Sequence, residues 1–168
     1  KELVDAFEPG DPRLKFTVAR NRDDYFGVTY FASFSSTQFS PLKYLQSDQE
    51  ATQKADGDIN YTAIRYAEVL LWEAEAQAEL NNIPAAKIPL EEVRARARAQ
   101  SATPATVLPP VNATDKAALL TAIRHERQVE LAFEMHRFFD IVRWGLAPQY
   151  LSNFKVGKHE LWPLPQTE

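Results

Sequence analysis

The stretch from Leu119 to Trp144 constrains the fold most, because its apolar and charged side chains recur every three or four residues. This spacing places side chains on one face of an α-helix. The face carries apolar residues at both ends and charged residues between them: Leu119, Ile123, Glu126, Glu130, Phe133, Arg137, Asp140 and Trp144. Charges on an otherwise apolar stripe predict that these charges are at least partly buried.

The charges in this stretch balance. Four arginines stand against four carboxylates: Arg124, Arg127, Arg137 and Arg143, with Glu126, Glu130, Glu134 and Asp140. A lone buried ion costs several kcal/mol, whereas an arginine and a carboxylate can satisfy each other through forked hydrogen bonds. We therefore predict a structural ionic network built from these eight side chains.

A catalytic carboxylate pair and a metal site are the two chemical alternatives to that network. Glu126 and Glu130 could act as acid and base on a glycosidic bond, but one helical turn between them gives no reason for their pKa values to separate. The zinc motif H-E-x-x-H would need a histidine where the chain has Val129. His125 and His136 lie about three helical turns apart, too far for one metal ion on a straight helix. We therefore predict no catalytic residues, no metal site and no cofactor.

Composition narrows the range of partners. The net charge of −4 and the lack of a strongly basic tract argue against nucleic acid. The most basic run, residues 93–98, follows Glu91 and Glu92, and we interpret it as a solvated helix face. No apolar run approaches about 18 residues, so no membrane span is predicted. Cysteine is absent, which excludes disulfides and thiolate sites from these 168 residues.

A helix pair is predicted for residues 61–100. The first helix, residues 61–82, carries an apolar stripe: Ile64, Ala67, Leu71, Ala74 and Ala78. Asn81 and Asn82 suit a left-handed cap at its end. The second helical stretch covers about 85–100, and we expect its true start at Pro89, because proline removes a backbone donor and clashes with the preceding turn.

A second helical region is predicted for residues 114–145, after a proline-rich linker at 101–113. Thr114 is the expected N-cap of a helix through 115–135, helical periodicity resumes at 136–144, and Gly145 is the expected stop. The pairs 61–82 with 85–100 and 114–135 with 136–145 resemble tetratricopeptide hairpins, although two units do not establish a repeat. Residues 146–168 are predicted to form an extended tail.

Residues 1–60 are predicted to be extended and rich in loops. A turn precedes a strand-like alternation over residues 15–19, and residues 25–47 are dense in aromatic side chains without a helical or strand period. We predict a long loop there with at most one short β-hairpin. Residues 48–58 are a polar connector that we expect to be mobile.

Four segments, in order along the chain, resemble motifs of the SusD/RagB family of outer-membrane nutrient-binding lipoproteins. They are LVDAFEPGDPR (3–13), IRYAEVLLWEAEAQAEL (64–80) followed by EEVRARA (91–97), ERQVELAFEMHRFFDIVRWG (126–145) and HELWPLPQTE (159–168). The resemblance covers nearly the whole chain and corresponds to the C-terminal part of the family, so residues 1–168 are expected to be a piece of a longer protein. The sequence departs from the family pattern at Met135, where glycine is common, at Phe138, where tryptophan is common, and at Pro89.

The resemblance implies a mainly α-helical SusD-like fold with tetratricopeptide-like helix pairs and long loops. It implies a cell-surface protein of the outer membrane, held by a lipid anchor outside this chain. Such a protein binds oligosaccharide without catalysis and passes it to a partner SusC-like TonB-dependent transporter. The alternative reading is a helical-repeat scaffold that binds peptide or protein in a concave groove.

The aromatic loop supplies the candidate ligand contacts. Sugar rings have apolar C–H faces and a rim of hydroxyl groups, so aromatic rings beside polar side chains suit them. Tyr25, Tyr30, Phe34 and Tyr44 are the candidate ligand-binding residues, with Ser35 and Gln38 as polar partners. Some of these rings can instead fill the core. Trp72 and Trp162 are expected to be packing residues.

Overall fold

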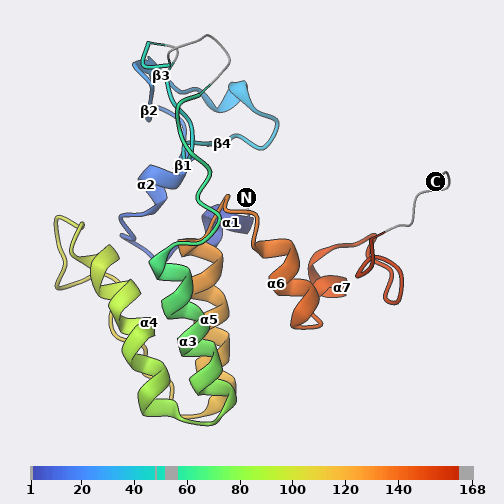
Figure 1. Ribbon diagram of the computed structural model, residues 1–168. Helices are drawn as coiled ribbons and strands as arrows, with labels where there is room; N and C mark the ends of the chain where they lie inside the picture. Colours follow the sequence, from blue (N-terminus) through green and yellow to red (C-terminus); the bar gives the residue numbers. More distant parts are fainter. Residues whose placement is uncertain (1, 48, 52–56, 163–168) are drawn as a thin grey trace.

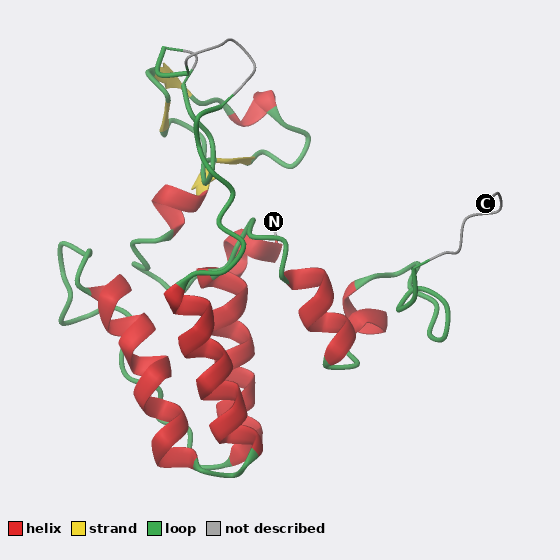
Figure 2. Cartoon of the chain, viewed as in Figure 1, coloured by secondary structure: helices red, strands yellow, loops and turns green. Residues whose placement is uncertain are grey.

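The structure, a computed structural model, describes residues 2–47, 49–51 and 57–162. It consists of a helical bundle, a lobe of short strands and loops above one end of the bundle, and an arm of two short helices beside it (Figure 1). Helix is the dominant regular structure (Figure 2), as predicted. In the described ranges no helix is both long enough and apolar enough to cross a membrane.

The bundle is built from α3 (Tyr66–Glu79), α4 (Ile83–Arg98) and α5 (Lys116–Glu130). Their facing sides share one apolar core, whose most deeply buried members are Leu71, Ala74, Ala78, Ala86, Leu90, Val93, Leu119 and Ile123. The predicted stripe on the first helix is confirmed from Ala67 onward. Ile64 is 59% exposed and precedes the helix, so the predicted start at residue 61 was wrong.

The ends of the helices follow local rules. Asn81 has φ of +60° and closes α3, which confirms the predicted left-handed cap. The N-cap of α5 is Asp115, whose Oδ1 accepts the Ala118 N–H at 2.9 Å, and not Thr114 as predicted. Pro89 lies inside α4, which begins six residues earlier, so the predicted start at Pro89 was also wrong. The ring of Pro89 is buried, and packing of α4 on α3 offsets the lost backbone hydrogen bond.

The helix predicted for 115–135 ends early, at Glu130. Phe133 and Met135 then adopt φ of +62° and +64°, and these left-handed residues turn the chain away from the α5 axis. As a result Phe133 leaves the predicted stripe and is 45% exposed. The chain continues in α6 (Arg137–Arg143) and α7 (Ala147–Tyr150), with Gly145 at φ of +70° between them, as expected for a helix stop.

The lobe and its approach contain α1 (Glu2–Ala6), α2 (Leu14–Thr17), β1 (Val18–Ala19), β2 (Asp24–Tyr25), β3 (Val28–Thr29), the 3₁₀ turn η1 (Ala32–Phe34) and β4 (Ser40–Pro41). The β2–β3 pair is the predicted hairpin, and β1 pairs with β4 in a second two-stranded antiparallel sheet. The extended run predicted for residues 15–19 is only half correct, because α2 occupies residues 14–17.

The segment between α4 and α5 packs back on the N-terminal segment. Val107 and Leu108 are buried, and the Leu108 carbonyl accepts the Arg98 Nε–H at 2.9 Å. Gly10 has φ of +79°, and a Cβ there would lie 2.7 Å from Val107 Cγ1, so only glycine fits this approach. Part of the connector predicted at 48–58 and the end of the tail, 163–168, lie outside the described residues.

Candidate functional site

Three carboxylates form the centre of an ionic network at the lobe end of α5. Glu126, Glu130 and Glu134 are 0%, 3% and 1% exposed, so the predicted burial of charge is confirmed. Their cationic partners all come from other segments: Arg13, Lys43, Arg65, Arg94 and Arg96.

Each carboxylate has at least two cationic partners. Glu126 accepts from Arg13 Nη1 at 2.5 Å and from Arg94 Nη1 at 2.8 Å. Glu130 accepts from Arg13 Nη1 at 3.0 Å and, through its other oxygen, from Arg65 and Arg96 at 2.7 Å each. Glu134 accepts two Arg65 hydrogen bonds of 2.7 Å and one from Lys43. The network is therefore saturated at its centre.

The predicted membership of this network needs correction. The four arginines of the 124–143 stretch do not serve Glu126, Glu130 or Glu134. Arg127 and Arg143 instead hold Asp140, at 2.8 Å and 3.0 Å, and Arg143 also binds Glu75 at 2.5 Å. Neither Arg124 nor Arg137 forms an ion pair with any described residue; each lies over an aromatic ring.

The interpretation of residues 93–98 as a solvated helix face also needs correction. Arg94 is only 4% exposed, and besides Glu126 it binds Glu8 at 2.7 Å and the Pro109 carbonyl at 2.9 Å. Arg96 is half exposed but reaches Glu130. These arginines lie on the side of α4 that faces α5 and the N-terminal segment, so their charges are structural.

The electrostatics keep Glu130 and Glu134 ionised. Burial alone would raise the pKa of Glu130, but the charges of Arg65, Arg96 and Arg13 outweigh it and lower the pKa. The pKa of Glu134 is lowered in the same way, by hydrogen bonds from Arg65 and Lys43 against the effect of burial. A general acid needs the opposite shift, so these groups are unsuited to donate a proton at neutral pH.

The two histidines of the stretch from Leu119 to Trp144 lie in different surroundings. His125 Nε2 is 2.6 Å from the Ala6 carbonyl, and His136 Nδ1 is 3.3 Å from Glu68 Oε1. Within the described part of the chain, no three His, Cys, Asp or Glu side chains converge in a way that could hold a metal ion.

The aromatic candidates separate into three groups. Tyr30 is 1% exposed, with its hydroxyl 3.1 Å from that of Ser40, so the proposal that it contacts ligand was wrong: its ring fills the centre of the lobe. Phe34 is 57% exposed and packs edge-on against Tyr30 at 5.4 Å between ring centres. Tyr25 is half-buried against Tyr30 at 5.6 Å. Tyr44 lies apart from these rings, at the base of the lobe.

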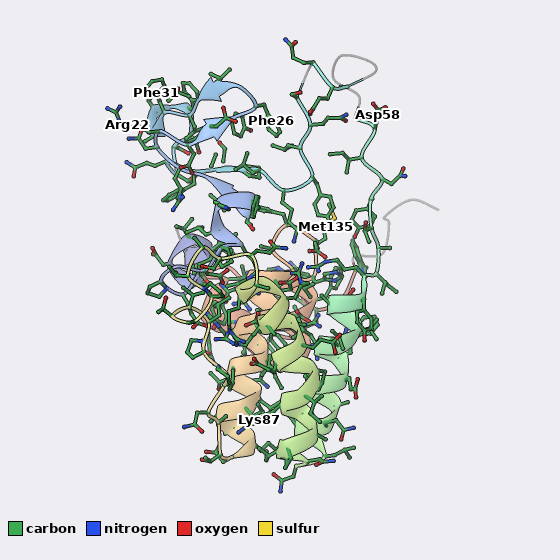
Figure 3. All side chains as sticks on the ribbon, turned by 90° about the vertical axis from the view of Figure 1, so that its left-hand side faces the viewer. Arg22, Phe26, Phe31, Asp58, Lys87 and Met135 are labelled. Carbon is green, nitrogen blue, oxygen red and sulfur yellow. The ribbon has the colours of Figure 1, made fainter. Side chains whose placement is uncertain are left out.

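The lobe also exposes an aromatic residue that was not predicted. Phe31 is 47% exposed and meets Phe34 at 5.7 Å between ring centres. The hydroxyls of Ser35 and Thr37 are 2.9 Å apart beside this pair, and Gln38 is exposed. Figure 3 shows Phe31 on the lobe, at the opposite end of the molecule from Lys87 on α4. No periodicity in residues 25–44 distinguished Phe31 from Tyr30.

Tyr44 lines a cavity of about 420 Å³ between the lobe and the bundle. Phe16 and Lys43 line it from the lobe side, and Arg65 and Arg96 from the bundle side. Of the four candidate rings, only Tyr44 lines this cavity, whose walls carry charged side chains.

Two tryptophans that were expected to be packing residues are exposed at the surface. Trp72, on α3, is 43% exposed and Trp162, in the tail, is 84% exposed. Trp144 by contrast is half-buried, and its Nε1–H donates to Glu75 at 2.7 Å.

Comparisons with known proteins agree with this architecture. Residues 1–161 match the model of the SusD family. The chain is 35% identical over 127 residues to SusD-like protein P2 of Formosa agariphila, covering 67% of this chain and 24% of that protein. It is 36% identical over 146 residues to SusD-like protein P25 of the same organism, covering 87% and 25%.

A crystal structure of a SusD superfamily protein from Bacteroides vulgatus matches with a TM-score of 0.66 and 27% identity, covering 95% of this chain and 36% of that one. The chain belongs to the SusD family, whose members are binding proteins associated with the outer membrane as lipoproteins. It spans about a quarter of the length of the two Formosa agariphila proteins.

Proposed function

We propose that the full-length protein captures an oligosaccharide at the cell surface and passes it to a SusC-like TonB-dependent transporter in the outer membrane. It does so without catalysis, and a lipid anchor outside these residues holds it at the membrane. Membership of the SusD family supports this role. The observation that carries it to particular residues is the pair of exposed rings, Phe31 and Phe34, on the lobe.

The chemistry of this pair suits a sugar. The two rings meet edge-to-face, which leaves apolar surface for the C–H face of a sugar ring. Ser35 directly follows Phe34 in sequence, and its hydroxyl and that of Thr37, 2.9 Å apart, can exchange hydrogen bonds with sugar hydroxyls. Tyr30 supports Phe34 from within the lobe. In this proposal Phe31, Phe34 and Tyr25 contact ligand, and Tyr44 extends the site toward the cavity at the base.

The ionic network gives this lobe a fixed base. Arg13 precedes the lobe in sequence and Arg65 follows it, and both bind Glu130 of α5. Lys43, from within the lobe, donates to the Glu130 backbone carbonyl at 2.9 Å and also binds Glu134, just after the helix. Both ends of the lobe segment and one point inside it are thus attached to the same helix. A site that is held in place before ligand arrives loses less entropy on binding.

The test is calorimetric titration of the full-length protein with a panel of neutral oligosaccharides. For a ligand that binds, Phe34→Ala and Phe31→Ala should each weaken affinity about tenfold or more, as truncation of a central aromatic contact does. Trp72→Ala is the matched control, because Trp72 is a similarly exposed aromatic residue on α3, outside the lobe. Unchanged affinity in both phenylalanine variants would refute the lobe as the site.

A scaffold that binds peptide remains the alternative function. It predicts that a peptide library, and not the oligosaccharide panel, yields binding that the lobe variants leave unchanged.

A further inference from the structure

Arg124 and Arg137 differ in their contacts from Arg127 and Arg143, the other two arginines of the stretch from Leu119 to Trp144. No described carboxylate lies within 4.0 Å of either guanidinium. Arg124 instead lies over the Trp144 ring at 5.1 Å, and Arg137 over the Tyr150 ring at 4.7 Å. The Nε of Arg124 is buried without a hydrogen-bond partner. Their donors are therefore available, whereas those of Arg13 and Arg65 are occupied by carboxylates.

Both arginines line one hollow of about 400 Å³ between α5 and the α6–α7 arm. The other lining residues are Thr121, His125, Gln128, Trp144, Leu146 and Tyr150. This lining contains no aspartate or glutamate, so the two guanidiniums give the hollow a formal charge of +2 with His125 neutral. Arginines held close together without counter-charge favour a negatively charged occupant.

Several contacts fix the walls of the hollow. The Trp144 indole is held by its hydrogen bond to Glu75, and the Thr121 hydroxyl donates to the Ala117 carbonyl at 2.9 Å. His125 is held against the Ala6 carbonyl through Nε2. Because the aromatic rings restrict the guanidiniums, little side-chain freedom remains to be lost when an anion arrives.

We propose that this hollow binds an oxyanion, the carboxylate or sulfate group of an acidic saccharide, through Arg124 and Arg137. The planar fork of a guanidinium matches two oxygens of such a group, and the volume lies in the range of small-molecule sites. The amide of Gln128 also lines the hollow and can pair with a sugar hydroxyl. Binding of an oxyanion goes beyond the proposed function. The inference that the oxyanion belongs to a saccharide rests on that function.

The experiment titrates the full-length protein with sodium sulfate and, separately, with sodium D-glucuronate. Ionic strength is kept constant with sodium chloride, and tryptophan fluorescence and calorimetry are recorded. We expect saturable binding of at least one anion and a fluorescence change from Trp144. Arg124→Gln and Arg137→Gln should each weaken binding about tenfold or more, because each removes charge-assisted hydrogen bonds. Arg137→Lys keeps the charge without the fork and should lie between wild type and Arg137→Gln.

Arg22→Gln is the matched control, since it removes one positive charge from an exposed arginine on the lobe (Figure 3), and Arg22 does not line the hollow. It should bind both anions as the wild type does. The glutamine variants break no ion pair to a described residue, and far-ultraviolet circular dichroism checks that they fold.

Three results would overturn the proposal. The first is a wild-type protein that shows no saturable binding of either anion. The second is an equal loss of affinity in Arg22→Gln, which would mean general charge attraction. The third is unchanged anion binding in both Arg124→Gln and Arg137→Gln, which would mean that the anion binds outside the hollow. These outcomes are independent of neutral-oligosaccharide binding by Phe31 and Phe34, so failure of one proposal leaves the other to be judged separately.

Discussion

Replacement of Glu126 by alanine tests the central physical claim, that the buried charges on α5 hold the fold together. Glu126 is fully buried between Arg13 and Arg94. Removing one partner of a buried ion pair typically costs about 3–5 kcal/mol, because it leaves a buried charge without compensation. Here each arginine keeps another carboxylate, Asp11 for Arg13 and Glu8 for Arg94. We therefore expect the lower end of the range, about 3 kcal/mol.

That loss is large enough to measure directly. For a chain of this size it corresponds to a fall in Tm of about 6–12 °C. Urea unfolding followed by circular dichroism gives the free energy of unfolding of each variant. Glu92→Ala is the matched control, because Glu92 is an exposed glutamate on α4 and its loss should change stability by less than about 0.5 kcal/mol. If Glu126→Ala were as stable as Glu92→Ala, the network would contribute no net stability and the reasoning would fail.

Two further predictions concern the same helix and the turn after it. Acidification should destabilise the protein: the folded pKa values of Glu130 and Glu134 are lowered from 4.5, so their stabilisation is complete above that pH and is lost as the pH falls through the folded values. Urea midpoints at pH 7 and pH 3.5 measure this loss, and a Glu130→Gln variant that retained the full pH dependence would contradict the assignment. Met135→Gly should stabilise by about 1 kcal/mol, because Met135 has φ of +64° and is 74% exposed, so glycine relieves left-handed strain at little cost in packing. Thermal melts of both proteins check this, and a lower Tm for the glycine variant would mean that packing of the methionine side chain outweighs the backbone strain.

Much of the bundle could be predicted because its determinants are local. The apolar spacing from Ala67 to Ala78 fixes which side of α3 is buried, and Asn81 and Gly145 mark helix ends through their tolerance of positive φ. The end of α5 could not be predicted in this way. Phe133 and Met135 have side chains that ordinarily disfavour a left-handed backbone, so helical periodicity appeared to continue through them.

The ion-pair partners of the buried carboxylates on α5 could not be predicted either, although the burial of the carboxylates could. A helical stripe shows that Glu126 and Glu130 face the interior, but pairing is decided by tertiary contacts. Arg13 reaches Glu126 from 113 positions away in sequence, and Arg65 reaches Glu130 from 65 positions away. Charge balance within residues 124–143 therefore did not identify the ion pairs: cations from other segments bind Glu126, Glu130 and Glu134, and Arg124 and Arg137 pair with no described carboxylate.

The aromatic lobe shows the same limit. In a regular strand or helix, the periodicity of apolar and polar residues distinguishes buried from exposed rings. Residues 25–44 have no sustained period of this kind. Tyr30 became the centre of the lobe and Phe31, next to it, became surface. For function, this means that the carboxylates and the unpaired arginine of α5 have different roles. Carboxylates such as Glu130 attach the lobe at both of its ends, whereas Arg124, which pairs with no described carboxylate, is a group that we propose meets a ligand.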